Sequence, residues 1–396
     1  MPHICHISTT FNLRSGSARR TSAILKGCLE QGYKVSLIIG RDHDVRQEDL
    51  PEIDIFVVPE LLKYIAPFSD LIVPWKIRTI LKQIKPDLVH THLAKAGISG
   101  RLAAVSFRIP CVIHTVHGPT FPKHFHPVKR WAFRLLERFC GRFTDRFVFV
   151  GHEVQAEYLE AKVCLPEKAD VIQTGRPDAV FERAGLSESG KLELRSELCG
   201  HGNPELLIVT VGRLVPSKQL EHSIRIVKAL HLQHVPAHLA IVGKCLLAEE
   251  RQYEEELIKL ARDFGVQKNV HFCGFRNDII DIMEAADVVL LTSRYEGLPN
   301  VAVEAVISGT PMVTYEVSGV QEILKDGVSG WIVPQGDMDQ IVDRIMEIGC
   351  GQSGFTDFYD VHADNILHDF RESVMVARKI LLYERVFSNL SRNWLT

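Results

Sequence analysis

The sequence predicts an α/β fold of two doubly wound domains, and three observations lead to this prediction. Short β-branched runs such as 34–39 alternate with longer helical patterns, which is typical of βαβ units and a mainly parallel sheet. The alternation stops in a polar stretch near the middle of the chain and restarts with the very apolar run 206–211. The length of 396 residues is enough for two or three domains.

The polar stretch sets the expected domain boundaries. It is rich in Ser, Glu and Gly, which is typical of a linker. The last segment of the chain has a helical pattern with no strand after it, so we expect it to pack across both domains. The expected parts are an N-terminal domain over 1–175, a connection over 176–203, a C-terminal domain over 204–362 and a crossover helix over 363–396.

The strands and helices are expected in the following order. In the first half, strands are predicted at 3–8, 34–39, 53–58, 88–90, 111–115 and 146–150, with helices ending near 31 and at 71–84, 94–107 and 127–143. In the second half, strands are predicted at 206–211, 238–242, 270–272, 288–292 and 312–315, with helices from about 219 and at 250–264, 277–285, 300–308 and 337–347.

Composition excludes several classes of protein. The net charge of −3 gives no sign of nucleic-acid binding. No apolar run reaches the roughly 18 residues of a membrane span, and the first residues do not resemble a signal peptide. Nine cysteines without a C-x-x-C pair are typical of free thiols in a reducing compartment. We therefore expect a cytoplasmic protein, with peripheral binding to the inner face of the cytoplasmic membrane as the alternative.

Ligands of open α/β sheets bind beyond the carboxyl ends of the strands, so the loops there carry the candidate site. After the first strand, Gly16 precedes a helix, and a glycine before a helix N-terminus suits an anion; a plain glycine turn is the alternative. The loop is not G-x-G-x-x-G, which disfavours a dinucleotide. After the strand 206–211 come Arg213 and Lys218, a cationic pair that suits a diphosphate unless it is only a solvated surface pair.

The most specific pattern follows the strand 288–292. Glu296 and Glu304 are eight residues apart, and the segment Gly297-Leu298-Pro299-Asn300 between them predicts a turn that opens a helix. Backbone N–H groups at that helix start would form an anion site. A carboxylate inside an otherwise apolar helix needs a partner, which sugar hydroxyls or an ordinary salt bridge would supply.

Histidines follow two further strands. His117 precedes Gly118 and is expected to face a substrate, with a core or capping role as the alternative. His90 and His92 end another strand, but no cysteine or carboxylate has a zinc-site spacing with them, so we expect no metal. The D-x-D sequences at 42–44 and 337–339 are interpreted as structural.

Together these residues resemble the retaining, nucleotide-sugar-dependent glycosyltransferases of family 4, which have two Rossmann-like domains facing across a cleft, the GT-B fold. The resemblance covers most of the chain. The family's E-x7-E motif matches Glu296 and Glu304, its G-R-L-x-x-x-K segment matches 212–218, and its H-G element matches His117 and Gly118. The usual I-P-N-G turn is replaced by Ile-Gln-Thr-Gly at 172–175.

The resemblance implies a role for each matched residue. Arg213 and Lys218 should bind the donor diphosphate, and Glu304 should accept hydrogen bonds from the ribose. Glu296 and His117 should contact the donor sugar. The remaining expected donor contacts are Gly16 on the diphosphate, Arg276 near the base, and the segment Gly297, Leu298, Pro299 and Asn300 near sugar and phosphate.

The implied activity is metal-independent, retaining transfer of a sugar, from a UDP-sugar or else a GDP-sugar, to a glycan or polyprenyl-linked sugar in surface polysaccharide or glycoconjugate biosynthesis. The nucleotide sugar is a co-substrate, and no cofactor is expected. The alternatives are another GT-B enzyme, such as a sugar-nucleotide epimerase or an inverting transferase, and a catalytically inactive scaffold subunit.

Residues 123–146 have a distinctive composition. Seven Lys and Arg residues oppose only Glu137 and Asp145, and aromatic residues such as Trp131 and Phe139 lie among them. A basic, aromatic amphipathic helix is typical of binding to an anionic membrane surface. The alternative is a domain helix with a solvated basic face.

Overall fold

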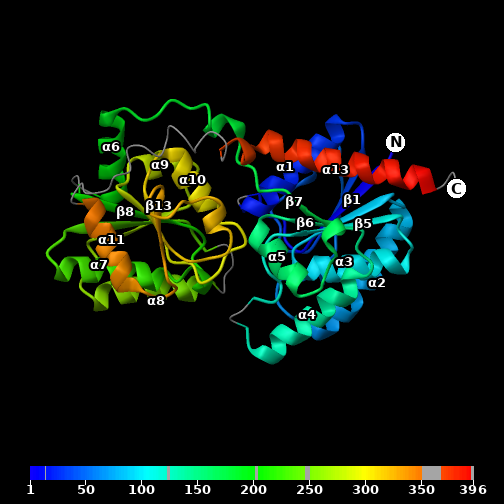
Figure 1. Ribbon diagram of the computed structural model, residues 1–396, viewed down its shortest axis with the longest axis horizontal. Helices are drawn as coiled ribbons and strands as arrows, with labels where there is room; N and C mark the ends of the chain where they lie inside the picture. The colour runs from blue at the N-terminus through cyan, green and yellow to red at the C-terminus, as the bar shows by residue number, and fades with distance from the viewer. Residues whose placement is uncertain (14, 123–124, 201–203, 246–249, 350–366, 394–396) are drawn as a thin grey trace. The chain divides into compact units, whose positions relative to one another are not determined.

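The computed structural model describes residues 1–13, 15–122, 125–200, 204–245, 250–349 and 367–393. It divides into two compact units. Unit 1 contains Met1–Arg176 and Asp369–Thr396, and unit 2 contains Pro177–His368. Each unit is a parallel sheet with helices on both faces (Figure 1).

Unit 1 contains a seven-stranded parallel sheet in the order β3-β2-β1-β4-β5-β6-β7. Its strands are β1 (His3–Ser8), β2 (Lys34–Ile39), β3 (Asp54–Val57), β4 (Leu88–His92), β5 (Cys111–Val116), β6 (Arg146–Phe149) and β7 (Ala169–Val171). Its helices are α1 (Gly16–Glu30), α2 (Pro67–Ile84), α3 (Ala94–Ser106), α4 (Pro127–Gly141), α5 (His152–Glu160) and α13 (Glu372–Asn393).

Unit 2 contains a six-stranded parallel sheet in the order β10-β9-β8-β11-β12-β13. Its strands are β8 (Leu206–Val211), β9 (Ala237–Val242), β10 (Val270–Gly274), β11 (Val288–Leu291), β12 (Met312–Tyr315) and β13 (Gly330–Val333). Its helices are α6 (Glu188–Cys199), α7 (Leu220–Leu232), α8 (Arg251–Asp263), α9 (Ile279–Glu284), α10 (Asn300–Ser308) and α11 (Met338–Gly349).

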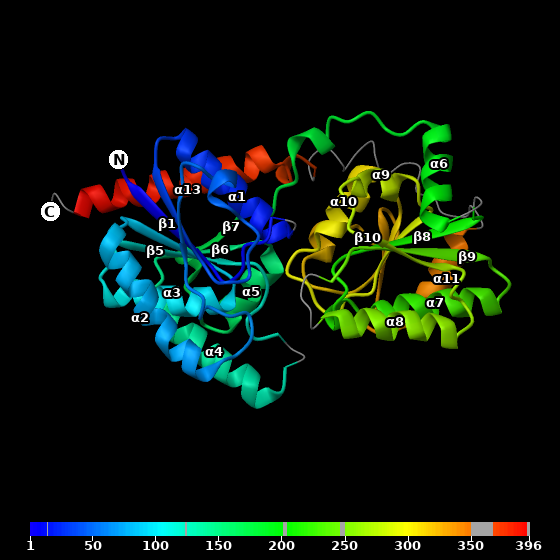
Figure 2. The same ribbon diagram turned by 180° about the vertical axis from the view of Figure 1, so that it is seen from behind.

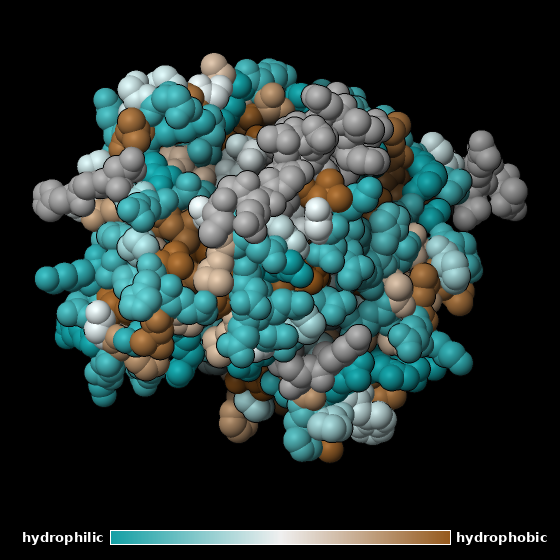
Figure 3. Space-filling view, turned by 60° about the vertical axis from the view of Figure 1, so that its left-hand side comes forward, coloured by the Kyte–Doolittle hydropathy of each residue, from teal (hydrophilic) through white to brown (hydrophobic). Residues whose placement is uncertain are grey.

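Burial on both faces explains why the central strands are apolar throughout. All six residues of β1 are buried; Ile4 packs with α1 and α13, whereas Ile7 packs with α2 and α3 on the opposite face. Strands covered by helices on both sides carry continuous apolar runs rather than alternating ones. On the face of the molecule drawn in Figure 3, hydrophilic residues predominate, with hydrophobic residues scattered among them.

The C-terminal helix α13 packs in unit 1. It lies beside α1 (Figures 1 and 2), where a Cβ on Gly27 would come within 2.4 Å of Val376 Cγ1, so glycine permits the close approach. Lys379 and Tyr383 of α13 are buried under the sheet. The prediction placed this helix across both domains; contact clustering groups it with unit 1. The expected connection over 176–203 also differs, because it contains α6, which packs on the sheet of unit 2.

No helix in the described part of the chain has the length and apolar character needed to cross a membrane.

Candidate functional site

The loops that follow β8 and β11 bring together two of the predicted donor-binding residues. Lys218 Nζ donates a hydrogen bond to Glu296 Oε1 over 2.5 Å, and about one fifth of each side chain is exposed. The backbone N–H of Arg294 donates to the Ser217 carbonyl over 2.8 Å, which joins the two loops. The sheet therefore presents an ion pair, rather than an isolated lysine, beyond its carboxyl edge.

Close backbone packing positions Lys218. A Cβ on Gly212 would lie 3.1 Å from Lys218 Cε, so the glycine leaves room for the lysine side chain. Gly243 has a φ of +144°, and a Cβ there would lie 1.8 Å from the Gly212 carbonyl oxygen. The hydroxyl of Thr292, just after β11, donates to the carbonyls of Lys218 and Gln219 over 3.0 Å. The turn that carries Lys218 is therefore held by contacts with the residues that follow β9 and β11.

Arg213 lies in the same loop with a more open environment. Its Nη1 is 3.4 Å from Glu250 Oε1, and 43% of its side chain is exposed. The side chain of Glu250 is itself buried. Arg213 therefore keeps a partly solvated guanidinium beside the predicted diphosphate position.

The second glutamate, Glu304, lies inside α10 and is only 5% exposed. The helix begins at Asn300 after Pro299, whose side chain makes no capping hydrogen bond to the first turn. Gly319 packs against this turn with a φ of +77°, and a Cβ on it would lie 2.8 Å from the Gly297 carbonyl oxygen. The turn 297–300 is thus supported from behind, and its helix N-terminus favours an anion.

Arg276, predicted near the nucleotide base, is held by two carboxylates of unit 2. It donates to Asp278 from Nε over 2.9 Å and from Nη2 over 2.5 Å, and it pairs with Glu197. These pairs raise the pKa of Arg276 and lower that of Asp278. The role of Arg276 toward a base stays a prediction.

In unit 1, the predicted glycine loop lies next to a buried cation that sequence reasoning missed. Ser15 caps α1 by accepting from the Ala18 N–H over 3.4 Å, and a Cβ on Gly16 would lie 3.0 Å from Arg20 Nη1. Arg20 is 8% exposed, and its Nε and Nη1 have no hydrogen-bond partner among the described residues. Burial lowers its pKa to about 9. A buried guanidinium needs an anionic partner.

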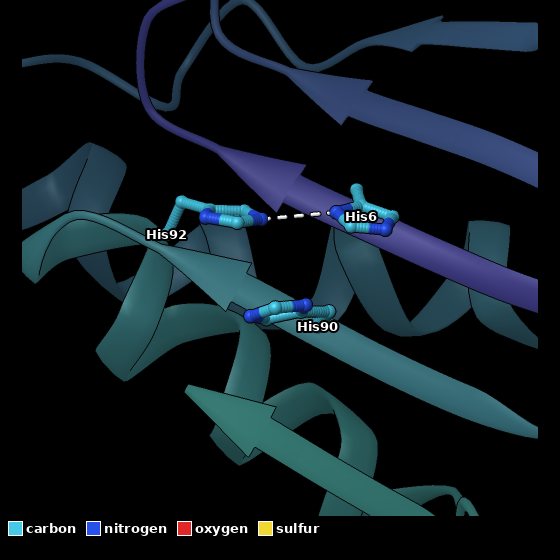
Figure 4. Close-up of side chains that lie close together, drawn as sticks. All are labelled: His6, His90 and His92. Atoms are coloured by element: carbon cyan, nitrogen blue, oxygen red, sulfur yellow. Dashed lines mark hydrogen bonds between the residues drawn. The ribbon is translucent and has the colours of Figure 1, made fainter. Parts of the chain in front are cut away.

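His117, the predicted sugar contact, is the end of a row of buried histidines. Its Nε2 is 3.3 Å from His92 Nδ1, and His92 Nε2 is 2.9 Å from His6 Nδ1 (Figure 4). Within the described chain, His117 Nδ1 has no hydrogen-bond partner. Burial lowers the pKa of His117 to about 3, and the Arg20 guanidinium acts in the same direction. His117 is therefore a neutral imidazole at neutral pH.

His90 stacks beside this row and connects it to α13. Its ring nitrogens lie 2.5 Å from the Tyr383 hydroxyl and 2.7 Å from the Thr115 hydroxyl. Lys379 Nζ donates to the same Thr115 hydroxyl over 2.9 Å. Burial lowers the pKa of Lys379 to about 7.

The predicted helix in the basic segment 123–146 is present as α4. Helix α4 exposes its apolar residues, with Trp131 63% exposed, while Arg130 and Arg138 donate to the carbonyls of Phe121 and Ala161. The helix is anchored by Glu137, which is fully buried. Lys123 lies outside the described residues. The exposed face of α4 is therefore mainly apolar, with cations along its edges, rather than a solvated basic face.

Two family models match the chain. The model for glycosyl transferases group 1 matches residues 199–349, and the glycosyl transferase 4-like domain matches 15–175. An uncharacterized glycosyltransferase of Methanocaldococcus jannaschii is 35% identical over 345 residues, covering 84% of this chain and 85% of that protein. The UDP-Gal:alpha-D-GlcNAc-diphosphoundecaprenol alpha-1,3-galactosyltransferase of Escherichia coli is 28% identical over 295 residues, 74% of each chain.

Solved structures show the same fold. Anabaena HepE in complex with UDP and glucose superimposes with a TM-score of 0.78 at 21% identity, covering 96% of this chain and 99% of HepE. Sucrose-phosphate synthase of Thermosynechococcus elongatus gives a TM-score of 0.79 at 19% identity, and the match covers 98% of this chain and 100% of the enzyme's chain. The chain therefore belongs to the group 1 glycosyltransferases and is a glycosyltransferase of the GT-B fold.

Proposed function

We propose that this glycosyltransferase moves a sugar from a UDP-sugar to a lipid-linked sugar during assembly of a surface polysaccharide. We further propose that transfer retains the anomeric configuration and needs no metal ion. The main support is the Lys218–Glu296 ion pair beyond the sheet of unit 2, with Glu304 buried in the helix that follows. The names of two relatives support the donor and the pathway: the E. coli galactosyltransferase, and a capsular polysaccharide biosynthesis glycosyltransferase of Staphylococcus aureus that is 25% identical over 295 residues, 74% of each chain.

The charges suit departure of a nucleoside diphosphate. When the bond between the anomeric carbon and the diphosphate oxygen breaks, negative charge develops on the diphosphate. Lys218, Arg213 and the N-terminus of α10 are fixed groups that favour this charge without a metal ion. In a retaining front-face transfer, the acceptor oxygen bonds to the same face of the anomeric carbon, and its proton passes to the leaving diphosphate oxygen.

The carboxylates have a binding role in this proposal rather than that of a glycosidase acid–base pair. Glu296 accepts hydrogen bonds from hydroxyls of the donor sugar while its partner Lys218 faces the diphosphate. The ion pair therefore positions the sugar relative to the phosphate groups. Glu304 accepts from the ribose hydroxyls. A buried carboxylate that binds hydroxyls should affect donor affinity more than the chemical step.

From unit 1 we assign donor contacts to Gly16, His117 and Arg20. Arg20 supplies a buried guanidinium with unpartnered nitrogens at the start of α1, which suits an anion. The neutral imidazole of His117 has an unpartnered Nδ1 that can exchange a hydrogen bond with a sugar hydroxyl.

Donor binding tests the site. Titration of UDP- and GDP-sugars by calorimetry should give one preferred donor for the wild-type chain. Lys218→Ala removes a charge-assisted hydrogen bond to the diphosphate, worth roughly 1.5–3 kcal/mol, so donor binding should weaken about 10- to 100-fold. Lys268→Ala, an exposed lysine before β10, is the matched control and should bind normally. Equal affinity of the Lys218→Ala and wild-type chains would refute the site.

Product analysis separates the alternatives. With a lipid-linked acceptor, NMR of the product should show the anomeric configuration of the donor, and an inverted product would refute retention. Interconversion of nucleotide sugars without acceptor would indicate an epimerase. A chain that binds no donor and releases no nucleoside diphosphate with any acceptor would indicate a scaffold subunit.

We also propose that unit 1 binds an anionic membrane surface, which would bring it to a lipid-linked acceptor. The exposed apolar face of α4 is accompanied by α2, where Phe68 is 87% and Trp75 68% exposed, and both helices pack against α3. Arg142 is exposed after the end of α4. Tryptophan and cationic residues are favoured at lipid headgroups.

Vesicle sedimentation tests this surface. The wild-type chain should bind vesicles containing phosphatidylglycerol better than neutral vesicles, and added salt should weaken binding. Trp75→Ser and Trp131→Ser should each reduce binding, whereas Trp331→Phe in unit 2 is the control. Unchanged binding of the Trp75→Ser/Trp131→Ser double variant would refute the proposal.

A further inference from the structure

We propose that unit 2 binds a Zn²⁺ ion through Cys199, His238 and His271. One ligand atom from each residue lies within 4.8 Å of the other two. The imidazole atoms His238 Nδ1 and His271 Nε2 are 3.0 Å apart. This proposal is independent of the proposed function, because it concerns neither donor nor acceptor.

The local fold explains why three residues far apart in sequence meet. In β9, Ala237 and Leu239 face the core that contains α7 and α8, so His238 faces the opposite side of the sheet. In β10, Val270 and Phe272 face that same core, so His271 points to the side of His238. Helix α6 packs on this second side and ends at Cys199.

The ligand chemistry and spacing suit zinc. Cysteine thiolate and imidazole are the ligands that Zn²⁺ prefers, and tetrahedral coordination with bonds of about 2.0–2.1 Å places two ring nitrogens ~3.3 Å apart. In the structure these two nitrogens share a hydrogen bond over 3.0 Å, which the ion would replace at a similar separation. Cys273 lies on the same face of β10 and near enough to interact electrostatically with Cys199, so it is available as a fourth ligand.

The surroundings also suit a cation. Cys199 is the last residue of α6, where the helix dipole favours positive charge. Asn269 Nδ2 donates to His238 Nε2 over 3.0 Å. When zinc binds through His238 Nδ1, the amide must turn so that its oxygen accepts the Nε2–H. A thiolate offsets part of the ion's charge. His238 and His271 are partly exposed, which gives the ion a route from solvent.

A second histidine cluster lacks these features. His6, His90 and His92 also place ring nitrogens within 4.8 Å of one another (Figure 4). Lys379 adds a positive charge near these rings whenever it is protonated. In this described cluster there is no thiolate or carboxylate to neutralise a divalent ion, and burial of uncompensated charge is costly.

The position of the site separates it from sugar transfer. His238 and His271 are second residues of parallel strands, whereas Lys218 and Glu296 follow the carboxyl ends of strands in the same sheet. The ion would therefore join α6 to the edge strand β10 and stabilise unit 2, without a part in the chemistry.

Metal titration of the full-length chain, reduced and freed of metal by chelation, tests the proposal. One equivalent of Co²⁺ should bind and produce a thiolate-to-cobalt charge-transfer band, Zn²⁺ should displace it, and Zn²⁺ should raise the melting temperature of unit 2. Cys199→Ser should reduce the charge-transfer band by half or more, and His271→Gln should weaken Zn²⁺ binding more than about tenfold. Cys164→Ser and His152→Gln, both in unit 1, are the matched controls and should bind as the wild type does.

Two results would overturn the site. One is the absence of stoichiometric Co²⁺ and Zn²⁺ binding at micromolar metal. The other is binding that survives unchanged in both Cys199→Ser and His271→Gln, which would place the metal elsewhere. If Cys199→Ser does not fold, the partly exposed His271→Gln variant decides the question by itself, with circular dichroism confirming its fold.

Discussion

The buried histidines of unit 1 should make this unit unstable in mild acid. Burial lowers the pKa of both His6 and His117 to about 3. In the unfolded chain each would take up a proton near pH 6.5. Between these two values the unfolded state binds more protons than the folded state, so stability is complete above about pH 6.5 and falls as the pH is lowered.

The size of the effect follows from the pKa difference. One pKa unit corresponds to 1.36 kcal/mol, so at pH 5 each of these two histidines should lower the free energy of unfolding by about 2 kcal/mol. Burial also lowers the pKa of His90, His92 and His114, which adds to the loss in the same direction. A domain is typically stable by only about 5–15 kcal/mol, so a loss of 4 kcal/mol or more is large.

Titration of Lys379 does not contribute to the loss of stability between pH 6.5 and 5. Burial lowers its pKa to about 7, whereas the unfolded chain binds the proton up to about pH 10.4. Its contribution to the free energy of unfolding therefore decreases as the pH is lowered from about 10.4 to 7, and it is constant in the acid range. Mild alkali should stabilise unit 1 for this separate reason.

Hydrogen exchange read by mass spectrometry resolves the two units. The exchange rates are first corrected for the pH dependence of intrinsic exchange. Between pH 7 and 5 the opening free energy of the strands of unit 1 should then decrease by at least about 4 kcal/mol. That of the strands of unit 2 should decrease less. His6→Gln should reduce the slope by up to one proton, or about 1.4 kcal/mol per pH unit. An opening free energy of unit 1 that changes by less than about 1 kcal/mol would refute the reasoning.

Three further predictions follow from particular contacts. Glu137→Gln leaves Arg101 buried without its ion-pair partner and should lower the urea-unfolding free energy by about 3–5 kcal/mol, whereas a loss below 1 kcal/mol would contradict a buried pair. Gly319→Ala should raise the donor KM because its Cβ would meet the Gly297 carbonyl, and Gly327→Ala, with a similar φ of +71° in open space, should leave KM unchanged; equal KM values would contradict the support assigned to this turn. Chelation should leave the initial rate of transfer at 25 °C unchanged while it lowers the melting temperature, and loss of rate restored only by a divalent ion would refute metal independence.

The sequence was sufficient for the elements that are long or fully buried. Strands β1 and β8 were predicted with the bounds that the structure has, because burial on both faces requires a continuous apolar run. Strands β7 and β13 and helix α5 were not predicted. They have three, four and nine residues, and β7 is only half-buried, so each has little periodicity of its own. Pairing with a neighbouring strand, rather than local pattern, defines β7 and β13.

At the candidate site, sequence reasoning identified residues but not their partners. Lys218 and Glu296 were both assigned to the donor, yet the ion pair between them depends on two loops 78 positions apart meeting. Arg20 was visible only as one of two arginines at the start of a helix. Burial and the lack of a partner distinguish it, and both are tertiary properties. The same holds for Cys199, which has no cysteine or histidine at a zinc-site spacing that the sequence would show.

Helix α4 illustrates what composition alone leaves open about a surface. Its arginines and aromatic residues are compatible with membrane-surface binding or with a domain helix that has a solvated basic face. In the structure the buried residues of α4 are Glu137, Cys140 and Gly141, and Glu137 pairs with Arg101. Arg138 donates to the Ala161 carbonyl, and Trp131 is exposed to solvent. The membrane proposal therefore depends on the exposed tryptophans more than on the count of positive charges.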